Sequence, residues 1–260
     1  MAQLKQSEWH EQWQMFQDEE IFLFKDWIYP NTLEDFKDKE VLEAGCGGGQ
    51  HTLFIAPYAK TVTAVDLNTV EIARERNEAF HNIEFIEADI AEMNLQRQFD
   101  IVFCIGVIYH TDDPDKTVNN LKQHVKPGGK LILWVYSEEG NFLVRKFVEP
   151  IRKIFLQNMS RNNLMSLSSV ITSMMYLPIY TIYLLPLKFL PYYSYFENFR
   201  KMSFGRNNLN VFDKLNAPQV DFISRKRIGH WFSEEEFESI HISSYKNVSW
   251  RGSGTKRCRK

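Results

Sequence analysis

A glycine-dense turn at residues 41–49 constrains the fold more than any other feature of this chain. The stretch reads VLEAGCGGG, so a short apolar run ends in glycines, and a helical pattern begins at Gln50. Glycine has no side chain to hold another molecule away from the backbone, and it adopts positive φ at no steric cost. The first turn of the following helix offers backbone N–H groups that have no partner within the helix. We therefore expect this segment to bind a ligand through its backbone.

Apolar runs and helical patterns alternate along the first half of the chain. Strands are predicted at 40–44, 61–65, 83–88, 99–104 and 130–136, helices at 50–59, 69–80 and 113–125, and a turn at 127–129. Strands that alternate with helices of about 10–15 residues indicate βαβ units and a parallel sheet. Continuous apolar runs such as IVFCI and LILWV are typical of strands that are buried on both faces. The predicted fold class is therefore α/β.

Acidic residues follow or end the first three predicted strands. Glu43 precedes the glycines and suits a ligand that carries positive charge. Asp66 ends the second strand about 20 residues further on, where a carboxylate can accept hydrogen bonds from ribose hydroxyls. Asp89 can accept a hydrogen bond from an adenine amino group, and Ile90 can pack on the ring. A simpler role as a helix or turn cap stays open for Asp66 and Asp89.

Taken together, these motifs resemble those of the class I methyltransferases that use S-adenosylmethionine (SAM). VLEAGCGGG is similar to their first motif, VD at 65–66 to the second, and EADI at 87–90 to the third. FDIVFCIGVIYHTDDP, followed by LKQHVKPGGKLIL, is similar to the fourth and fifth. The resemblance covers about residues 38–137. It implies a Rossmann-like three-layer sandwich around a mostly parallel seven-stranded sheet whose last strand is antiparallel. A late helix at 224–237 would then precede strands six and seven at 240–245 and 248–252.

The resemblance implies SAM as the cofactor, bound outside the carboxyl ends of the first four strands, where open α/β sheets hold their ligands. The expected reaction moves the methyl group of SAM to an oxygen, nitrogen or carbon of a small or lipid-like acceptor. The residues expected to contact SAM are Glu43, Ala44, Gly45, Cys46, Gly47, Asp66, Leu67, Asp89, Ile90 and Ile105.

His110 is the candidate catalytic residue, as a general base. It follows the fourth strand on the cofactor side, and histidine titrates near neutral pH. A structural role that holds the loop is the alternative reading of His110. Glu138 and Glu139, which follow the fifth strand, are alternative bases. His230 and His241 are expected to be structural, and no histidine or carboxylate spacing indicates a metal site.

Two other function classes compete with an active methyltransferase. A nicotinamide-dependent oxidoreductase is disfavoured because Gln50 stands where the dinucleotide fingerprint has its last glycine. A non-catalytic protein that binds SAM stays open, because methyl transfer needs no invariant catalytic residue. The nearly balanced charge, −2 overall, indicates no nucleic-acid partner. Three cysteines without a CxxC pair and the absence of a signal peptide indicate a reduced, cytoplasmic protein.

Three segments are expected. Residues 1–38, rich in Trp and Phe, would form an N-terminal helical cap that either covers the cofactor or packs on the sheet edge. Residues 39–140 and 224–260 would form the SAM-binding methyltransferase domain. Residues 141–223 would form a helical or irregular insertion.

The insertion holds an amphipathic helix, expected at 141–157 and interrupted by Pro150, and an uncharged run at 162–187. Three readings of this region compete. Prolines and hydroxyl residues argue against a membrane-spanning helix, whereas a lid over the acceptor fits the family. Peripheral membrane contact through 141–200 fits the apolar surface with its basic flanks. The lid and membrane readings are compatible if the acceptor is a lipid, and the chain would then be cytoplasmic and membrane-associated.

Overall fold

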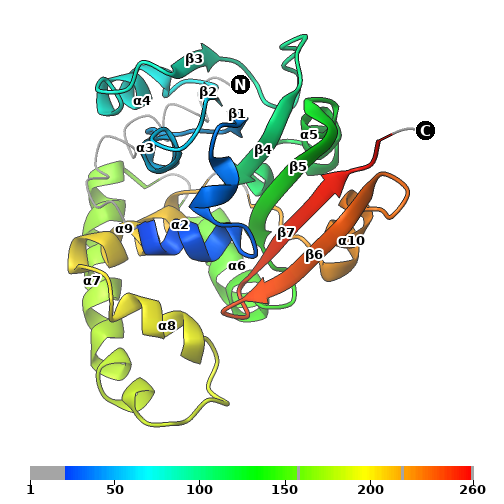
Figure 1. The fold of residues 1–260 in the computed structure, drawn as a ribbon. Helices are drawn as coiled ribbons and strands as arrows, with labels where there is room; N and C mark the ends of the chain where they lie inside the picture. Colours follow the sequence, from blue (N-terminus) through cyan, green and yellow to red (C-terminus); the bar gives the residue numbers. More distant parts are fainter. Residues whose placement is uncertain (1–20, 157–158, 218–219, 259–260) are drawn as a thin grey trace.

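Seven strands form a single sheet in the order β3-β2-β1-β4-β5-β7-β6 (Figure 1). The computed structural model describes residues 21–156, 159–217 and 220–258. The strands are β1 (Glu40–Ala44), β2 (Thr61–Asp66), β3 (Ile83–Glu87), β4 (Phe99–Ile105), β5 (Val125–Tyr136), β6 (Phe237–Tyr245) and β7 (Ser249–Lys256). The first five pair in parallel, and β7 runs antiparallel to both of its neighbours. The predicted fold class is confirmed, including the antiparallel last strand.

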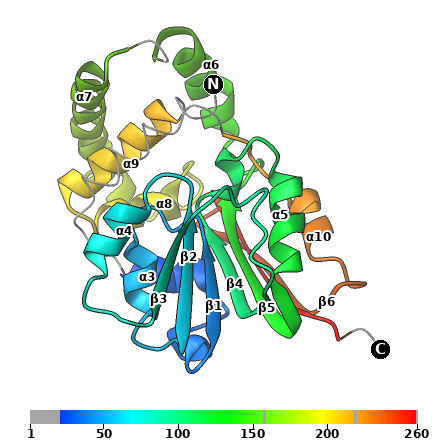
Figure 2. The ribbon, with the colours of Figure 1, turned by 90° about the horizontal axis from the view of Figure 1, so that it is seen from above.

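Helices cover both faces of the sheet. On one side lie α2 (Ile21–Ile28), the short helix η1 (Leu33–Phe36), α3 (Gln50–Ile55) and α4 (Val70–Arg76). On the other side α5 (Pro114–Gln123) packs beside α10 (Arg225–Trp231) (Figure 2). Most side chains of β1 and β4, and those of residues 131–135 in β5, are buried between these layers, as expected for strands at the centre of a sheet covered on both faces.

The predicted turn at 127–129 is wrong, because these residues lie within β5. Phe99 of β4 lies opposite Val125, whereas Ile101, two residues later, lies opposite Lys130. The strand therefore accommodates extra residues at this point without ending. The Pro-Gly-Gly sequence is typical of a turn, and only the pairing with β4 shows that the strand continues through it.

The predicted helix at 224–237 is too long. The observed helix α10 ends at Trp231, and Phe237 already begins β6. A Cβ atom added at Gly252 of β7 would lie 2.5 Å from the ring of Phe232. The phenylalanine ring, directly after the last helical residue, thus fills the space that the glycine leaves and packs this end of the helix against β7.

The insertion is helical. After β5 come the π-helical stretch η3 (Val144–Val148), α6 (Glu149–Ile151), the π-helical stretch η4 (Arg152–Leu156), α7 (Arg161–Ile179), η5 (Ile182–Leu184), α8 (Tyr193–Phe199) and α9 (Phe204–Asn216). Figure 2 shows α7 and α9 beyond one end of the sheet. Ser160 and Ser203 cap α7 and α9, each accepting a backbone hydrogen bond from the first turn.

The two ends of the insertion meet at the end of β5. Ile223 forms a parallel bridge with Ser137, and its backbone N–H donates to the carbonyl oxygen of Tyr136. Between these ends the insertion builds an apolar core of its own, to which Leu23 of α2 also contributes. The members of this core are Leu23, Leu156, Leu164, Ile179, Phe199, Met202, Val211, Phe212 and Leu215.

The expected helix break at Pro150 is wrong, since helical structure continues from residue 142 to residue 156. Proline removes one backbone donor, and its ring crowds the preceding turn. The wider π-helical turns on both sides of Pro150 accommodate that ring without ending the helix. Within the described residues, no helix is both long and apolar enough to cross a membrane.

Candidate functional site

The glycine-dense turn joins β1 to α3 at the carboxyl edge of the sheet. Gly45, Gly47 and Gly49 all adopt positive φ, at 78°, 53° and 74°. The backbone N–H of Gly45 donates to the carbonyl oxygen of Val65, which ties the turn to the neighbouring strand β2. A Cβ at Gly45 would lie 2.5 Å from the side chain of Val107, so both the backbone angle and the close packing demand glycine at this position.

Glu43 lies beneath this turn with only 1% of its surface exposed. Its Oε2 accepts a 2.5 Å hydrogen bond from the hydroxyl of Thr52, whereas its Oε1 has no hydrogen-bond donor among the described residues. The ring Nδ1 of His51 lies 3.7 Å from Oε1. Burial raises the pKa of Glu43 to about 8 and lowers the pKa of His51 to about 3. A buried, unsatisfied carboxyl oxygen of this kind is complementary to a cationic ligand.

Asp66 connects the turn to the end of β2. Its Oδ2 accepts a 2.9 Å hydrogen bond from the N–H of Gly47, and its Oδ1 accepts one from the N–H of Asn68 at 3.3 Å. Thr69, and not Asp66, occupies the cap position of α4. Each carboxylate oxygen has a second lone pair, so Asp66 keeps acceptor capacity for ribose hydroxyls. Leu67 follows directly at the same edge.

Asp89 and Ile90 lie after β3. The carboxylate of exposed Asp89 accepts a 2.8 Å hydrogen bond from the N–H of Ala91, so it has the turn-capping role that the sequence left open. Ile90 is buried in the main core, as are Cys104 and Ile105 of β4. Cys46 of the glycine turn is buried too, and burial raises its pKa well above the usual range, so its thiol stays protonated.

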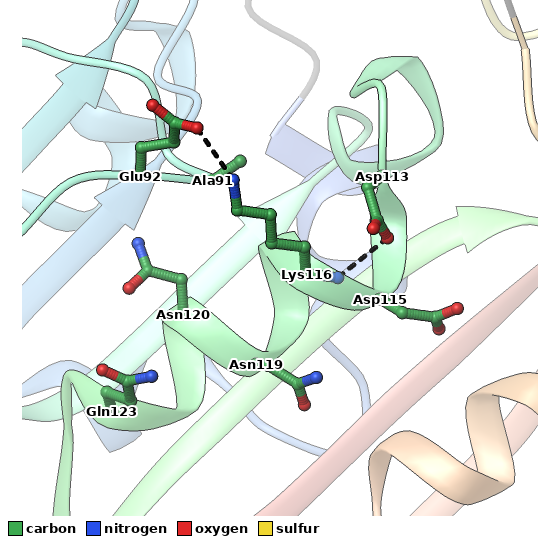
Figure 3. Close-up of a pocket in the computed structure, with 8 residues that line it drawn as sticks. All are labelled: Ala91, Glu92, Asp113, Asp115, Lys116, Asn119, Asn120 and Gln123. Carbon is green, nitrogen blue, oxygen red and sulfur yellow. Dashed lines mark hydrogen bonds and ion pairs between the residues drawn. The ribbon is translucent and has the colours of Figure 1, made fainter.

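A surface cleft lies close to Asp89 in sequence but on the outer side of α5 (Figure 3). Figure 3 shows Lys116 reaching across it to Glu92, at 2.7 Å, while the carboxylate of Asp113 accepts the backbone N–H of Lys116. These charges satisfy one another, so the cleft does not compete with the glycine turn as a cofactor site. The lining residues are Ala91, Glu92, Asp113, Asp115, Lys116, Asn119, Asn120 and Gln123.

Aromatic rings gather where β4 and β5 end. The ring of Tyr109 stacks on that of Tyr136, with centroids 4.3 Å apart. The ring of Phe222 also stacks on Tyr136, with centroids 6.3 Å apart. Trp134 lies 5.4 Å from Tyr136 and 4.9 Å from Trp27 of α2. These rings form an apolar wall beside the β4 turn.

His110 ends a short helix after β4, η2 (Ile108–His110), and its ring packs on Tyr109 with centroids 4.4 Å apart. It is partly buried at the carboxyl edge, where the sequence placed it. The alternative bases have other tasks. Glu138 forms an ion pair with Arg145 at 2.8 Å, and Glu139 accepts hydrogen bonds from the backbone N–H of Arg225 and the indole of Trp250.

The N-terminal aromatic residues divide into two groups. Phe24 and Trp27 of α2 are described: Phe24 is fully buried in the main core and stacks on His51 at 4.9 Å. Trp27 contacts His51 and Trp134, so α2 both packs on the sheet and borders the site. Trp9, Trp13 and Phe16 lie outside the described residues.

Sequence patterns missed the contribution of the insertion to this edge. Lys214 of α9 lies with its Nζ 5.7 Å from the centroid of Tyr136, and donates a 3.0 Å hydrogen bond to the hydroxyl of Tyr195. No motif marks Lys214, because its neighbours in space are far away in the sequence. Across the described ranges, no group of three or more His, Cys, Asp or Glu side chains is placed to hold a metal ion.

Comparison with known proteins identifies the part of the chain that carries this edge. Residues 42–133 match the family model described as a methyltransferase domain. These residues are similar to a methyltransferase domain. The match spans the glycine turn, Asp66, Asp89 and His110, so the resemblance inferred from the motifs is confirmed.

Curated relatives match over a similar stretch. The ubiquinone biosynthesis O-methyltransferase of Rickettsia typhi is 31% identical over 104 residues, which are 38% of this chain and 42% of the relative. The enzyme of that name from Coxiella burnetii (strain RSA 493 / Nine Mile phase I) is 34% identical over 100 residues, 36% of this chain and 42% of the relative. The chain thus spans less than half the length of these curated relatives.

Among solved structures, the CurJ carbon methyltransferase aligns with a TM-score of 0.50 and 12% identity, over 86% of this chain and 50% of that chain. At this level of identity the alignment supports the fold alone.

Proposed function

We propose that the chain is a SAM-dependent methyltransferase and that SAM binds at the carboxyl ends of β1 to β4. The observation that carries this proposal is the buried Glu43 beneath the glycine turn, whose Oε1 has no donor among the described residues. A ligand with an ammonium and a sulfonium group fits that carboxyl group, whereas a pyrophosphate does not. The proposed SAM contacts are Glu43, Ala44, Gly45, Cys46, Gly47, Asp66, Leu67, Asp89, Ile90 and Ile105.

Bound SAM supplies an electrophilic methyl group on a positively charged sulfur. The protein mainly has to hold the acceptor in line with that group and keep water out. The glycines allow close approach of the ligand to the backbone, and Asp66 and Asp89 offer carboxylate acceptors on either side. His110 lies at the same edge, and we assign it the proton of an acceptor hydroxyl or amine.

The proposal is tested by incubating the full chain with SAM labelled in the methyl group and an extract that contains small molecules and lipids. Transfer of label to any extract component supports the enzyme. SAM binding without any transfer would favour the alternative, a non-catalytic SAM-binding protein. Failure to bind SAM would refute both, and reduction of a nicotinamide cofactor would revive the oxidoreductase reading.

We further propose that the three parts of the chain divide the work: residues 39–140 and 224–260 hold SAM, residues 1–38 cap that domain, and residues 141–223 form the acceptor lid. Support comes from the apolar core of the insertion, which is distinct from the core of the sheet, and from the two ends of the insertion, which meet beside Tyr136. A hinge between nearby chain ends allows a lid to move as one body.

The insertion also supports the proposal of peripheral membrane contact by a cytoplasmic protein. Many of its large apolar side chains are exposed: Phe142, Leu143, Phe147, Ile151, Ile154, Phe155, Val170, Met174, Leu177, Tyr180, Ile182, Leu184, Leu185 and Phe189. Such concentrated exposure is unusual for a water-facing surface and is typical of an interaction site. Figure 1 shows α7 and α8 extending away from the sheet.

The charges on this surface favour an anionic membrane as the partner. Lys146 and Lys153 on the first helix and Lys188 after α7 are exposed or partly exposed among these apolar residues. Arg152, by contrast, is buried with 1% exposure, where it pairs with Glu149 at 2.7 Å. The helix thus turns its ion pair inward and its apolar side chains outward, the reverse of a helix that lies in water. A membrane-associated acceptor with a hydrophobic portion fits this arrangement.

A further inference from the structure

One cation of the insertion lies among the rings that border the proposed methyl site. Lys214 of α9 has its Nζ 5.7 Å from the ring centroid of Tyr136 and 5.4 Å from that of Tyr195. Its hydrogen bonds go to the hydroxyl of Tyr195, at 3.0 Å, and to the carbonyl oxygen of Asn210, at 3.5 Å. Both partners are neutral, so the positive charge is held by aromatic faces and dipoles and not by a hydrogen-bonded carboxylate.

In this position the ammonium group of Lys214 can donate a further hydrogen bond. An ammonium group has three donors, and the two bonds above use two of them, the second at the limit of hydrogen-bond length. No ion pair among the described residues includes Lys214, and the residue is only partly buried. Burial lowers the pKa of Lys214, but the neighbouring tyrosines and Asp213 raise it by more, so the group is charged at neutral pH.

The rings connect Lys214 to the turn after β4. Tyr136 stacks on Tyr109, and a Cβ at Gly106 would lie 3.6 Å from the hydroxyl of Tyr109. A second donor is found in the same group: the indole N–H of Trp134 is buried and has no acceptor among the described residues. Two donors with remaining hydrogen-bond capacity therefore lie within one group of packed rings.

The arginines of a second surface cleft nearby are neutralised, whereas Lys153 of the same cleft is exposed to solvent. This cleft lies beside Phe222 and holds Arg145 and Arg227, but Arg145 pairs with Glu138 and Arg227 pairs with Asp221 at 2.6 Å. Their charges are therefore committed to protein carboxylates. Lys214 differs from them because its strongest partner is a hydroxyl group.

We propose that Lys214 binds the acceptor oxygen in its ionised form, and that the site selects acceptors with a hydroxyl on a flat, conjugated ring or chain, that is, a phenol or an enol. The proposal rests on the methyltransferase function proposed above and names the acceptor class for that site. A flat group fits against the part of the apolar wall where Tyr136 is still partly exposed. The ammonium stabilises the oxyanion, which is the more nucleophilic form. The hydroxyl proton of the acceptor passes to His110, and Lys214 keeps its own proton throughout.

The test uses a chromogenic probe, a nitrophenol that carries an alkyl chain, bound to the full chain in the presence of S-adenosylhomocysteine. Phenolate absorbance, followed across pH, reports the pKa of the bound probe. An adjacent ammonium lowers the pKa of an acid by about one to three pH units. We expect that lowering in the unsubstituted protein and in Lys214→Arg, and its loss in Lys214→Met. Lys201→Met, which removes an exposed lysine of the same insertion, is the matched control and retains the lowering. An alkyl carboxylate competes with the probe if the site binds any oxyanion, and fails to compete if the flat phenol is required.

Three results would contradict the proposed role of Lys214. A bound probe with its ordinary pKa in the unsubstituted protein, an unchanged lowering in Lys214→Met, or no probe binding at all would overturn the role of Lys214. Circular dichroism and S-adenosylhomocysteine affinity show whether Lys214→Met is folded. If Lys214→Met does not fold, the probe pKa is measured instead in Lys214→Arg and Tyr195→Phe, both of which conserve the positive charge. If S-adenosylhomocysteine does not bind the unsubstituted protein, the methyltransferase proposal itself fails; if it binds while the probe pKa is unshifted, only the inference about Lys214 fails.

Discussion

Replacing Glu43 with Gln tests whether the buried carboxyl beneath the glycine turn recognises a cation. The glutamine side chain has nearly the same shape and can still accept the hydrogen bond from Thr52. It can neither carry a negative charge nor exchange a proton. The substitution therefore separates the electrostatic role of Glu43 from its packing.

The expected size follows from the raised pKa of Glu43. With a pKa of about 8, roughly nine in ten of the carboxyl groups are protonated at pH 7 before the ligand binds. A cation beside the carboxyl group favours the ionised form, so binding of SAM should release up to about 0.9 proton per site. The Gln variant should release close to none and should bind SAM about tenfold or more weakly, as a lost charge-assisted interaction implies.

Protein stability provides a second measurement. Between pH 4.5 and 8 the folded protein retains a proton on Glu43 that the unfolded chain has lost. The free energy of unfolding therefore falls as the pH rises through this window, and at pH 7 this costs about 3 kcal/mol. The ligand-free Glu43→Gln variant should lack this pH dependence, so its melting temperature relative to that of the unsubstituted protein should rise between pH 5 and pH 8.

Titration calorimetry in two buffers with different ionisation enthalpies measures the proton release, with scanning calorimetry for the melting temperatures. Work at or below pH 7 keeps the amino group of SAM protonated. A matched control is Glu34→Gln, an exposed glutamate in η1 away from the turn. Binding heats that do not depend on the buffer, or that depend on it equally in Glu43→Gln, would refute the electrostatic reasoning.

Three further predictions follow from the same site and from the insertion. Asp66→Ala should lower SAM affinity about 10- to 150-fold, because a charge-assisted hydrogen bond is worth roughly 1.5–3 kcal/mol, and unchanged affinity by calorimetry would contradict the assignment. His110→Ala should lower turnover about 10²–10⁴-fold with SAM binding nearly intact; near-normal turnover of labelled SAM would assign His110 to loop structure instead. Ile154→Ser combined with Phe155→Ser, at side chains 68% and 67% exposed, should weaken sedimentation with anionic liposomes roughly tenfold or more, whereas Tyr29→Ser, at an exposed aromatic residue outside the insertion, should not. If the unsubstituted protein does not bind liposomes, the insertion is a lid only.

The alternation of apolar strands and helices was readable in the sequence because it depends on local periodicity and on residues such as glycine that act through their own backbone. Gly45 adopts positive φ as the glycine-dense turn requires, and Asp66 and Asp89 lie after the strands that were predicted to carry them. In a parallel sheet the carboxyl ends of neighbouring strands share one edge, so residues at the ends of predicted strands converge without further information.

Errors arose where a local signal was overruled by packing between distant segments. Pro-Gly-Gly at 127–129 reads as a turn, but pairing with β4 keeps it within a strand. Pro150 reads as a helix break, but π-helical turns accommodate it. In both places the residue types correctly mark a position where regular backbone hydrogen bonding is difficult. Pairing with the neighbouring strand, or the wider helical turn, nevertheless lets the strand or helix continue.

Only the tertiary structure determines the protonation of the site residues and the side chains that they contact. The raised pKa of Glu43 depends on burial by residues from several elements, which sequence spacing does not contain. Lys214 meets Tyr136 only because the insertion returns to the end of β5 and brings the side chain of Lys214 over that ring. An amphipathic pattern shows that a helix has an apolar face, but not which way that face points. At 142–156 the fold turns the buried Arg152 inward and the apolar side chains toward the outside, since the ion pair with Glu149 and the hydrogen bond to Ala217 hold Arg152 in the interior.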